Sequence, residues 1–268
     1  MIDTLNAHAP GMRRAWRFGM ANAALKLEPT DDEPRERTIR ARRDRRVLAH
    51  MLRGLRFRMC RDGQDFARAV AVRRSVYAKE MRVPFPIPDR YDSWSWTIIA
   101  EDVATHEVVG TIRVTPRAGG PLEAEERFQL PEEYRTADTA EITRFAVLPT
   151  ARGRKGAMPV VFIGLVKAAI LFMQQIGTRH LVVKATSDRA WAYQWFNLKD
   201  TGLRAPYPGL GNELAMLLAC DFQEALAELR RSHRLGTFLL DIDTPEIEKT
   251  VPSRDAVSDE NAAVSRTA

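Results

Sequence analysis

Hydrophobic positions repeat with two different periods along the first half of the central region. Residues 64–80 carry apolar side chains every three or four positions, which predicts an amphipathic helix. A proline-rich loop follows, and the apolar segments 96–102 and 107–115, joined by a short turn, predict an antiparallel pair of strands. After a long loop, a run of β-branched and aromatic side chains predicts another strand over 140–147.

The second half of the central region alternates helical and strand patterns. Residues 158–176 predict a long helix that is apolar on nearly every side, most of it core, with a few side chains free to line an acyl tunnel. An antiparallel start followed by this alternation predicts one α/β domain with a mixed sheet over residues 63–243. The other expected elements are a strand over 180–186, a helix near 188–198, a strand over 213–219, a helix over 221–234 and a last strand over 237–243.

Positive charge is concentrated at the N-terminal end. The 268 residues carry a net charge of +6, and the first 62 hold 15 Lys and Arg against 8 Asp and Glu. Residues 1–62 are therefore predicted to form a basic helical extension. In one interpretation, these helices are solvated and simply dock on the core. In the other, the arm makes a weak contact with an acidic protein or a membrane surface, and nucleic acid is a less favoured partner. At the other end, residues 244–268 are polar without any aromatic side chain, which predicts a disordered tail.

Several classes of chemistry have no support in the sequence. Two cysteines, Cys60 and Cys220, are too few for a disulfide framework, which fits a reducing, cytoplasmic compartment. The five histidines are scattered singly, so no metal site is expected. The longest apolar stretch, 158–173, contains Lys167 and falls short of a membrane span, and there is neither a nucleophile elbow nor a phosphate-binding lysine loop.

Several charged residues stand inside elements that are otherwise apolar or stiffened by proline. Arg73 lies on the apolar face of the helix predicted over 64–80, where an arginine needs an acidic partner. Asp89 and Asp92 in the proline-rich loop offer one, and Arg113 stands in the middle of a strand. Taken singly, each is explained as well by an ordinary surface ion pair.

Glu141 and Arg144 pose a geometric question. They lie three residues apart in the strand predicted over 140–147, and a regular strand would point them to opposite faces. A shared role for both side chains therefore requires an irregular strand.

The order of these residues resembles a known signature. The motifs are "RRSVY" at 73–77, "DRYD" at 89–92, "GTIR" at 110–113, "ERFQLP" at 126–131 and "EITRF" at 141–145. The series is similar to that of the acyl-homoserine-lactone synthases and more closely to that of the N-acyl amino acid synthases, over about residues 64–240. Both belong to the GNAT acyltransferase superfamily. The resemblance implies a GNAT-like mixed, mostly antiparallel sheet flanked by helices.

The resemblance also implies roles for individual residues. The implied catalytic residues are Glu141, Arg144 and Arg113. Glu141 would take the proton of the attacking amine, and the two arginines would hold the Glu141 side chain in place. Substrate contacts fall on Arg73, Tyr77, Asp89, Asp92, Phe128, Phe145 and Val147.

The GNAT fold would resolve the question of Glu141 and Arg144. Its equivalent strand carries a β-bulge, and the inserted residue brings side chains three apart toward a common side. The bulge also leaves a backbone N–H free to stabilise the oxyanion. Splaying of this strand from the one at 180–186 would open a slot for a pantetheine arm.

The turn after this strand is the implied donor site. The superfamily's phosphate-binding turn is degenerate here because Lys155 replaces its first glycine. A more cationic turn suits acyl-phosphopantetheine on acyl carrier protein better than coenzyme A, which stays an alternative, and no tightly bound cofactor is implied. The implied donor-binding residues are Arg152, Arg154, Lys155, Gly156 and Ala157.

These inferences favour an N-acyltransferase that moves a fatty acyl group from acyl carrier protein to the amine of an amino acid or similar small molecule. Val83 stands where lactone synthases typically carry tryptophan, which argues against S-adenosylmethionine as the acceptor. The alternatives are an acyl-coenzyme A-dependent GNAT enzyme or a lactone synthase. From another class, the alternative is a basic nucleic-acid or membrane binding module on a degenerate acyltransferase core.

Overall fold

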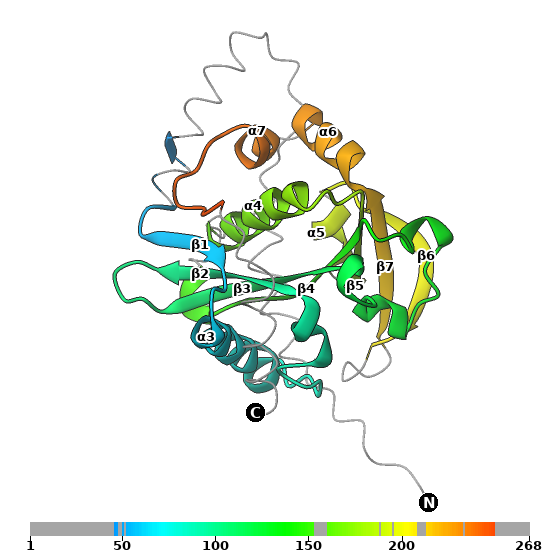
Figure 1. Ribbon diagram of the computed structural model, residues 1–268, viewed down its shortest axis with the longest axis horizontal. Helices are drawn as coiled ribbons and strands as arrows, with labels where there is room; N and C mark the ends of the chain where they lie inside the picture. Colours follow the sequence, from blue (N-terminus) through cyan, green and yellow to red (C-terminus); the bar gives the residue numbers. More distant parts are fainter. Residues whose placement is uncertain are drawn as a thin grey trace, which may run out of the picture.

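A seven-stranded sheet in the order β1-β2-β3-β4-β5-β7-β6 carries helices on both faces (Figure 1). The computed structural model describes residues 46–47, 50, 52–152, 160–187, 189–194, 196–207, 213–232 and 234–249. Neighbouring strands run antiparallel, except that β4 and β5 are parallel. The mixed, mostly antiparallel fold expected from the sequence is confirmed. The strands are β1 (Leu55–Met59), β2 (Trp96–Asp102), β3 (Val108–Pro116), β4 (Thr139–Val147), β5 (His180–Thr186), β6 (Lys199–Pro206) and β7 (Leu214–Asp221).

Helices α3 and α4 cover opposite faces of the sheet, and α6 and α7 lie beyond α4 (Figure 1). The α-helices are α3 (Gly63–Arg73), α4 (Val160–Gln175), α5 (Ala190–Gln194), α6 (Phe222–Ser232) and α7 (Arg234–Leu240). Short 3₁₀ helices span Arg90–Trp94, Arg117–Gly119, Glu123–Glu126, Glu132–Tyr134 and Pro149–Ala151. None of the helices that the structure describes has both the length and the apolar character needed to cross a membrane.

The helix expected over 64–80 consists of two different helical segments. Asp62 caps the start of α3, since its side chain accepts a hydrogen bond from the backbone N–H of Asp65 at 2.8 Å. After Arg73 the chain continues as a π-helix, Arg74–Glu80, which buries Tyr77 against the sheet. Such wider turns are frequent at functional sites.

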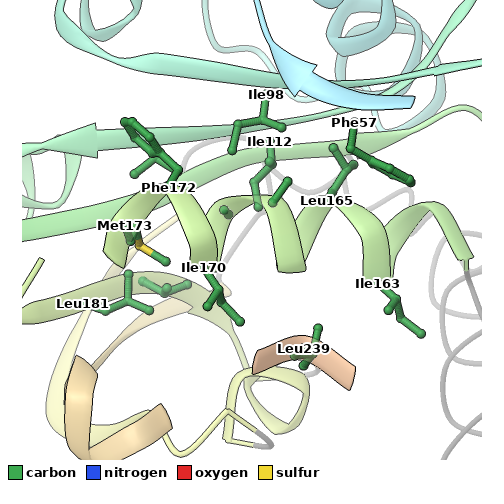
Figure 2. Packing of buried hydrophobic residues seen from close by; sticks show 14 of the residues in the cluster. Phe57, Ile98, Ile112, Ile163, Leu165, Ile170, Phe172, Met173, Leu181 and Leu239 are labelled. Carbon is green, nitrogen blue, oxygen red and sulfur yellow. The ribbon is translucent and has the colours of Figure 1, made fainter. Parts of the chain in front are cut away.

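Helix α4 is buried between the sheet and α7 (Figure 2). Ile98, Ile112 and Phe172 fill its contact with the strands, and Leu239 covers the opposite side. Gly164 permits the close approach, because a Cβ atom built there would lie 2.1 Å from the Phe57 ring. Strand β2 is buried on both faces: Ile98 packs toward α4 and Ile99 toward α3, which explains its continuous apolar run.

The structure of residues 55–59 differs from the helical extension expected there. The sequence interpretation placed them in the basic helical extension, yet they form β1, which pairs with β2. Phe57 and Met59 pack into the core on the α4 side, whereas Arg58 between them pairs with Asp65 of α3 on the other face, as the side chains of a strand do. The rest of the proposed extension lies almost entirely outside the described residues.

The C-terminal part brings two further corrections. The strand expected over 237–243 is wrong, because α7 occupies residues 234–240; the ammonium of Lys167 on α4 donates to the carbonyls of Phe238 and Ile242. A cation near a helix C-terminus satisfies the last carbonyls and stabilises the helix. Strand β6 had not been expected, and the helix expected near 188–198 is described only as α5.

The start of the predicted C-terminal tail is ordered. The N–H of Phe57 donates to the carbonyl of Glu246 at 2.8 Å, and the N–H of Glu248 donates to the carbonyl of Phe57 at 2.9 Å. Ile247 between them is buried. Residues 246–248 therefore cover the outer edge of β1, and the tail beyond residue 249 lies outside the described residues.

Candidate active site

A cavity opens where β4 and β5 separate. These strands pair only over Thr139 to Glu141 on β4, so they diverge beyond Glu141. The cavity between their diverging halves has a volume of about 510 Å³ and is lined by residues of both strands. This volume lies within the range of ~300–1,000 Å³ that is usual for small-molecule sites. A slot between the two strands, as expected from the sequence, is present.

Most of the cavity wall is apolar and comes from elements on the α4 side of the sheet. Burial raises the pKa of the Cys220 thiol to about 12, so this side chain is protonated and unreactive at neutral pH. The apolar residues contributed by α4, β5, β7 and α6 are Phe162, Val166, Ile170, Met173, Leu181, Val183, Ala185, Cys220, Phe222, Ala225, Leu226 and Leu229.

A β-bulge interrupts β4 beside this cavity. Two residues of β4, Arg144 and Phe145, stand opposite the single residue Ile112 of β3. Arg144 has a φ of 51°, in the left-handed region that a non-glycine residue adopts at a cost. The inserted residue leaves Arg144 on the same face as Glu141, and the irregularity required by their spacing is therefore real.

The π-helix is tied to the bulge by one hydrogen bond. The hydroxyl of Tyr77 donates to the carbonyl oxygen of Phe145 at 2.6 Å. Burial raises the pKa of Tyr77, which keeps the hydroxyl protonated as a donor. The ring of Phe145 turns to the other face and packs edge-on against Phe162 of α4, with centroids 5.0 Å apart.

Four charged residues expected at the site form a buried network on the α3 face. Arg73 Nη1 lies 2.6 Å from Asp92 Oδ1, and Arg113 Nη1 lies 2.6 Å from Asp89 Oδ1 and 3.2 Å from Asp92 Oδ1. Both aspartates also cap the 3₁₀ helix Arg90–Trp94 through a reciprocal capping box. Although burial opposes it, Arg73 and Arg113 lower the pKa of Asp92. This network fixes the proline-rich loop onto the sheet.

Glu123 lies at the centre of a second group of charges. Its carboxylate lies 2.6 Å from Arg113 Nη2, 3.1 Å from Arg144 Nη1 and 2.9 Å from Lys184 Nζ. Arg144 also donates to Asp89, so the two groups are continuous. Against the opposing effect of burial, the cations of Arg144, Lys184 and Arg113 lower the pKa of Glu123 to about 2.

Glu141 is the most enclosed carboxylate of the cluster. It is fully buried, and Oε2 accepts a hydrogen bond from the N–H of Ala124 at 3.1 Å. Oε1 accepts no hydrogen bond and lies 3.4 Å from Lys184 Nζ. Burial raises the pKa of Glu141, an effect that Lys184 opposes. Glu141 is thus the carboxyl group of the cluster most ready to hold a proton.

Sequence reasoning missed Glu123 and Lys184, and both line the cavity. Lys184 carried a signal, since it is a charged residue inside the apolar strand β5. Glu123 carried none that separates it from Glu125 and Glu126 nearby. The eight charged residues brought together are four cations and four carboxylates: Arg73, Arg113, Arg144, Lys184, Asp89, Asp92, Glu123 and Glu141.

Most of the expected site residues that the structure describes fall into two groups around the cavity. Those that line it are Tyr77, Arg144, Phe145, Val147 and Arg152. Those that lie behind its wall in the buried network are Arg73, Asp89, Asp92, Arg113 and Glu141. Phe128 does neither, because it packs with Leu122 and Leu130 in a separate apolar cluster on the far side of β5.

The expected donor turn is described only at its first residue. Arg152 Nη1 and Nη2 each lie 2.6 Å from a carboxylate oxygen of Glu80, and Nε donates to the carbonyl of Val147 at 2.9 Å. Arg152 therefore ties the end of β4 to the end of the π-helix. The other donor-site residues, Arg154, Lys155, Gly156 and Ala157, lie outside the described residues.

Comparison with known protein families shows which family this chain belongs to. The model of the N-acyl amino acid synthase FeeM family matches residues 68–221, more than half of the chain. The chain belongs to this family. The activity class is accordingly acyl transfer to an amine. Among curated proteins, none matches the sequence.

Solved structures show the same fold at low identity. FeeM, an N-acyl amino acid synthase from uncultured soil microbes, is 16% identical, with a TM-score of 0.52 over 69% of this chain and 99% of FeeM. The acyl-homoserine lactone synthase MesI is 20% identical, with a TM-score of 0.52 over 73% of this chain and all of MesI. BjaI, another such synthase, is 19% identical, with a TM-score of 0.53 over 78% of this chain and all of BjaI.

The part of the chain that the structure describes contains no candidate metal-binding site. No group of three or more His, Cys, Asp and Glu side chains is arranged there to hold a metal ion. The charged cluster is instead closed by arginine and lysine partners.

Proposed function

We propose that the protein transfers a fatty acyl group from acyl carrier protein to the amine of an amino acid or similar small molecule, by direct attack of the amine on the thioester. The observation that carries this proposal is the cavity between β4 and β5, which has an apolar interior and one charged wall at the bulge. An acyl chain fits the apolar part, while the reacting carbonyl and amine require the polar part.

The residues around the bulge are suited to three tasks of acyl transfer. The displaced backbone at Arg144 and Phe145 is where an N–H donor for the oxyanion is expected. Glu141 is the proposed proton acceptor for the attacking amine. Arg144 and Arg113 hold the surrounding carboxylates, and Asp89 and Asp92 act by fixing the loop rather than by touching the acceptor, since neither lines the cavity.

Two donors compete in this proposal. The cationic turn with Arg152, Arg154 and Lys155 favours acyl carrier protein, whose surface is strongly acidic. The structural relatives MesI and BjaI are described as coenzyme A-dependent, which makes acyl-coenzyme A the alternative donor. Both donors present the same thioester and pantetheine arm, so the chemistry at Glu141 is common to them.

The acceptor is proposed to be an amino acid rather than S-adenosylmethionine. Val83 lines the cavity at the position where lactone synthases typically carry tryptophan. Loss of a large aromatic surface removes a stacking and cation–π partner for a sulfonium ligand. A lactone synthase remains the alternative product class.

The test is a thiol-release assay with purified full-length protein. Acyl carrier protein or coenzyme A carrying the same acyl chain is supplied with an amino-acid mixture, with S-adenosylmethionine, or with no amine. The proposal expects free thiol only when amino acids are present, and faster release from the carrier protein. Mass spectrometry of lipid extracts from expressing cells then identifies the N-acyl product. Thiol release that does not depend on any amine would contradict the proposal.

A further inference from the structure

The buried position of Glu141 raises a problem for proton transfer. Its side chain is fully enclosed and forms no part of the cavity wall. A general base must lie within hydrogen-bond reach of the proton that it takes, directly or through a relay. An amine in the cavity therefore needs an intermediate group to reach Glu141.

Lys184 occupies the required place between Glu141 and the cavity. It lines the cavity, and its Nζ lies 3.4 Å from Glu141 Oε1, the oxygen that accepts no hydrogen bond. The same Nζ lies 2.9 Å from Glu123 Oε1. An ammonium group has three N–H donors, and the contact with Glu123 uses one, so two remain to reach Glu141 and a ligand.

We propose that Lys184 is the proton link between the reacting amine and Glu141, an inference that rests on the proposed acyl transfer. The proton of Lys184 moves to the Glu141 carboxylate, and neutral Nζ takes the proton of the amine as its nitrogen forms a bond to the thioester carbon. The carbon–sulfur bond then breaks, and the thiolate takes a proton from Lys184, which regains one from Glu141. The products are an amide and a free thiol, and both side chains return to their starting states.

The charges around this pair favour Glu141 over Glu123 as the end of the relay. Glu123 faces Arg113, Arg144 and Lys184, and a carboxylate held ionised by three cations is a weak base. Glu141 faces Lys184, Glu123 and Arg113 but is much more enclosed, which favours its neutral form. During the reaction the proton given up by Lys184 is therefore held by Glu141, and Glu123 keeps the lysine in position.

Replacement of Lys184 by Arg separates proton transfer from ion pairing. Arginine keeps the positive charge and the carboxylate partners but does not lose its proton in proteins. The proposal expects Lys184→Arg and Lys184→Met to lower kcat by ~10² to 10⁴-fold, with donor KM changing less than kcat. Lys199→Arg, the same change on exposed β6, is the control and leaves kcat unchanged. Near wild-type kcat in Lys184→Arg would overturn the proposal.

A second measurement does not depend on turnover. Glu141 is titrated in the substrate-free protein by the infrared carboxyl band that Glu141→Gln removes. Lys184→Met should shift this titration to higher pH, because the neighbouring cation is lost. An unchanged midpoint would overturn the link even in an active enzyme. If the wild type releases no thiol with any donor and amine, the proposed function fails, while this titration still decides whether the two groups are coupled.

Discussion

The hydroxyl of Tyr77 and the carbonyl of Phe145 are joined by a 2.6 Å hydrogen bond across 68 positions of sequence. The bond connects the π-helix after α3 to the bulged part of β4, where Arg144 occupies a left-handed conformation. A backbone held in such a conformation needs support from its surroundings. We infer that Tyr77 supplies part of that support.

The first prediction concerns this bond. Tyr77→Phe should lower the free energy of unfolding by ~1–2 kcal/mol, because a buried carbonyl loses its donor. It should lower kcat roughly tenfold if the bulge shifts. Urea denaturation and steady-state kinetics measure the two effects. Tyr91→Phe, which removes a hydroxyl bonded to exposed Arg90, is the control. Equal stability and equal kcat for both variants would show that the bond does not hold the bulge.

The second prediction concerns the proposed proton acceptor. Glu141→Gln keeps the shape of the side chain and an oxygen for the N–H of Ala124, so the fold should persist. Loss of general-base assistance should lower kcat by ~10² to 10⁴-fold. Steady-state kinetics over a range of pH, with thermal unfolding as the fold check, measures both. Glu107→Gln in an exposed turn should behave as the wild type. Near wild-type turnover of Glu141→Gln at every pH would remove Glu141 from the mechanism.

The third prediction is a loss of stability in acid. The pKa of Glu123 is lowered to about 2 in the folded protein, below its ordinary value, so the unfolded state binds more protons between about pH 4.5 and pH 2. Its contribution is present above that window and is lost as the pH falls through it. The stability difference between wild type and Glu123→Gln should therefore be largest near pH 6 and should shrink toward pH 2, measured by urea denaturation.

Glu126→Gln is the control for this experiment. It lies on the same 3₁₀ helix but pairs with exposed Arg90, and exposed pairs contribute ~0–1 kcal/mol. Its stability difference from the wild type should be small at every pH. A constant difference for Glu123→Gln across the acid range would contradict the assignment of a lowered pKa.

The fourth prediction concerns the apolar end of the cavity. Ala225 of α6 is buried and lines the cavity, so Ala225→Phe should fill part of the space and favour shorter acyl chains. Competition between donors of two chain lengths, read by mass spectrometry of the products, measures the ratio. One methylene in an apolar pocket is worth ~1–3 kcal/mol, so the ratio should change at least tenfold. Ala227→Phe, on the exposed side of α6, should leave it unchanged. An unchanged ratio in Ala225→Phe would place the chain elsewhere.

The fifth prediction concerns the donor. Reversal of Arg154 and Lys155 to Glu should raise KM for the carrier-protein donor and flatten its salt dependence, because complementary charge speeds encounter and is screened over ~8 Å at physiological salt. A small acyl-pantetheine donor should be little affected by either change. Kinetics at several salt concentrations measure this. Faster turnover with acyl-coenzyme A than with the carrier protein would reject the proposed donor.

The sequence predicted best those parts of the fold that are formed by continuous apolar runs. Strand β2 matches its predicted bounds, and α4 and β5 match closely, because each is a continuous apolar run. Strand β6 was missed since it contains Gly202, ends in Pro206 and is mostly exposed, so it lacks apolar alternation. The short apolar run at 237–240 was interpreted as a strand, although it belongs to helix α7. Nothing in the sequence indicated the hydrogen bond from Lys167 to the carbonyl of Phe238 near the end of this helix.

The candidate site was predictable only where charge stood out against an apolar background. Arg113 and Arg73 were visible because they lie on faces that must be buried. Glu123 was not, since its position at the cluster depends on how a long loop folds back over the sheet. The position of Arg144 was predicted only through the GNAT resemblance, because a strand segment without glycine carries no sequence signal for a β-bulge.

The contact between residues 246–248 and β1 has a consequence for biosynthesis. Phe57 is translated long before Glu246 and Glu248, so until they are made the nascent chain lacks these partners for the N–H and the carbonyl of Phe57. Open edges recruit strands from neighbouring chains. A prematurely terminated product that stops before residue 246 would contain the whole charged cluster and yet be prone to aggregation.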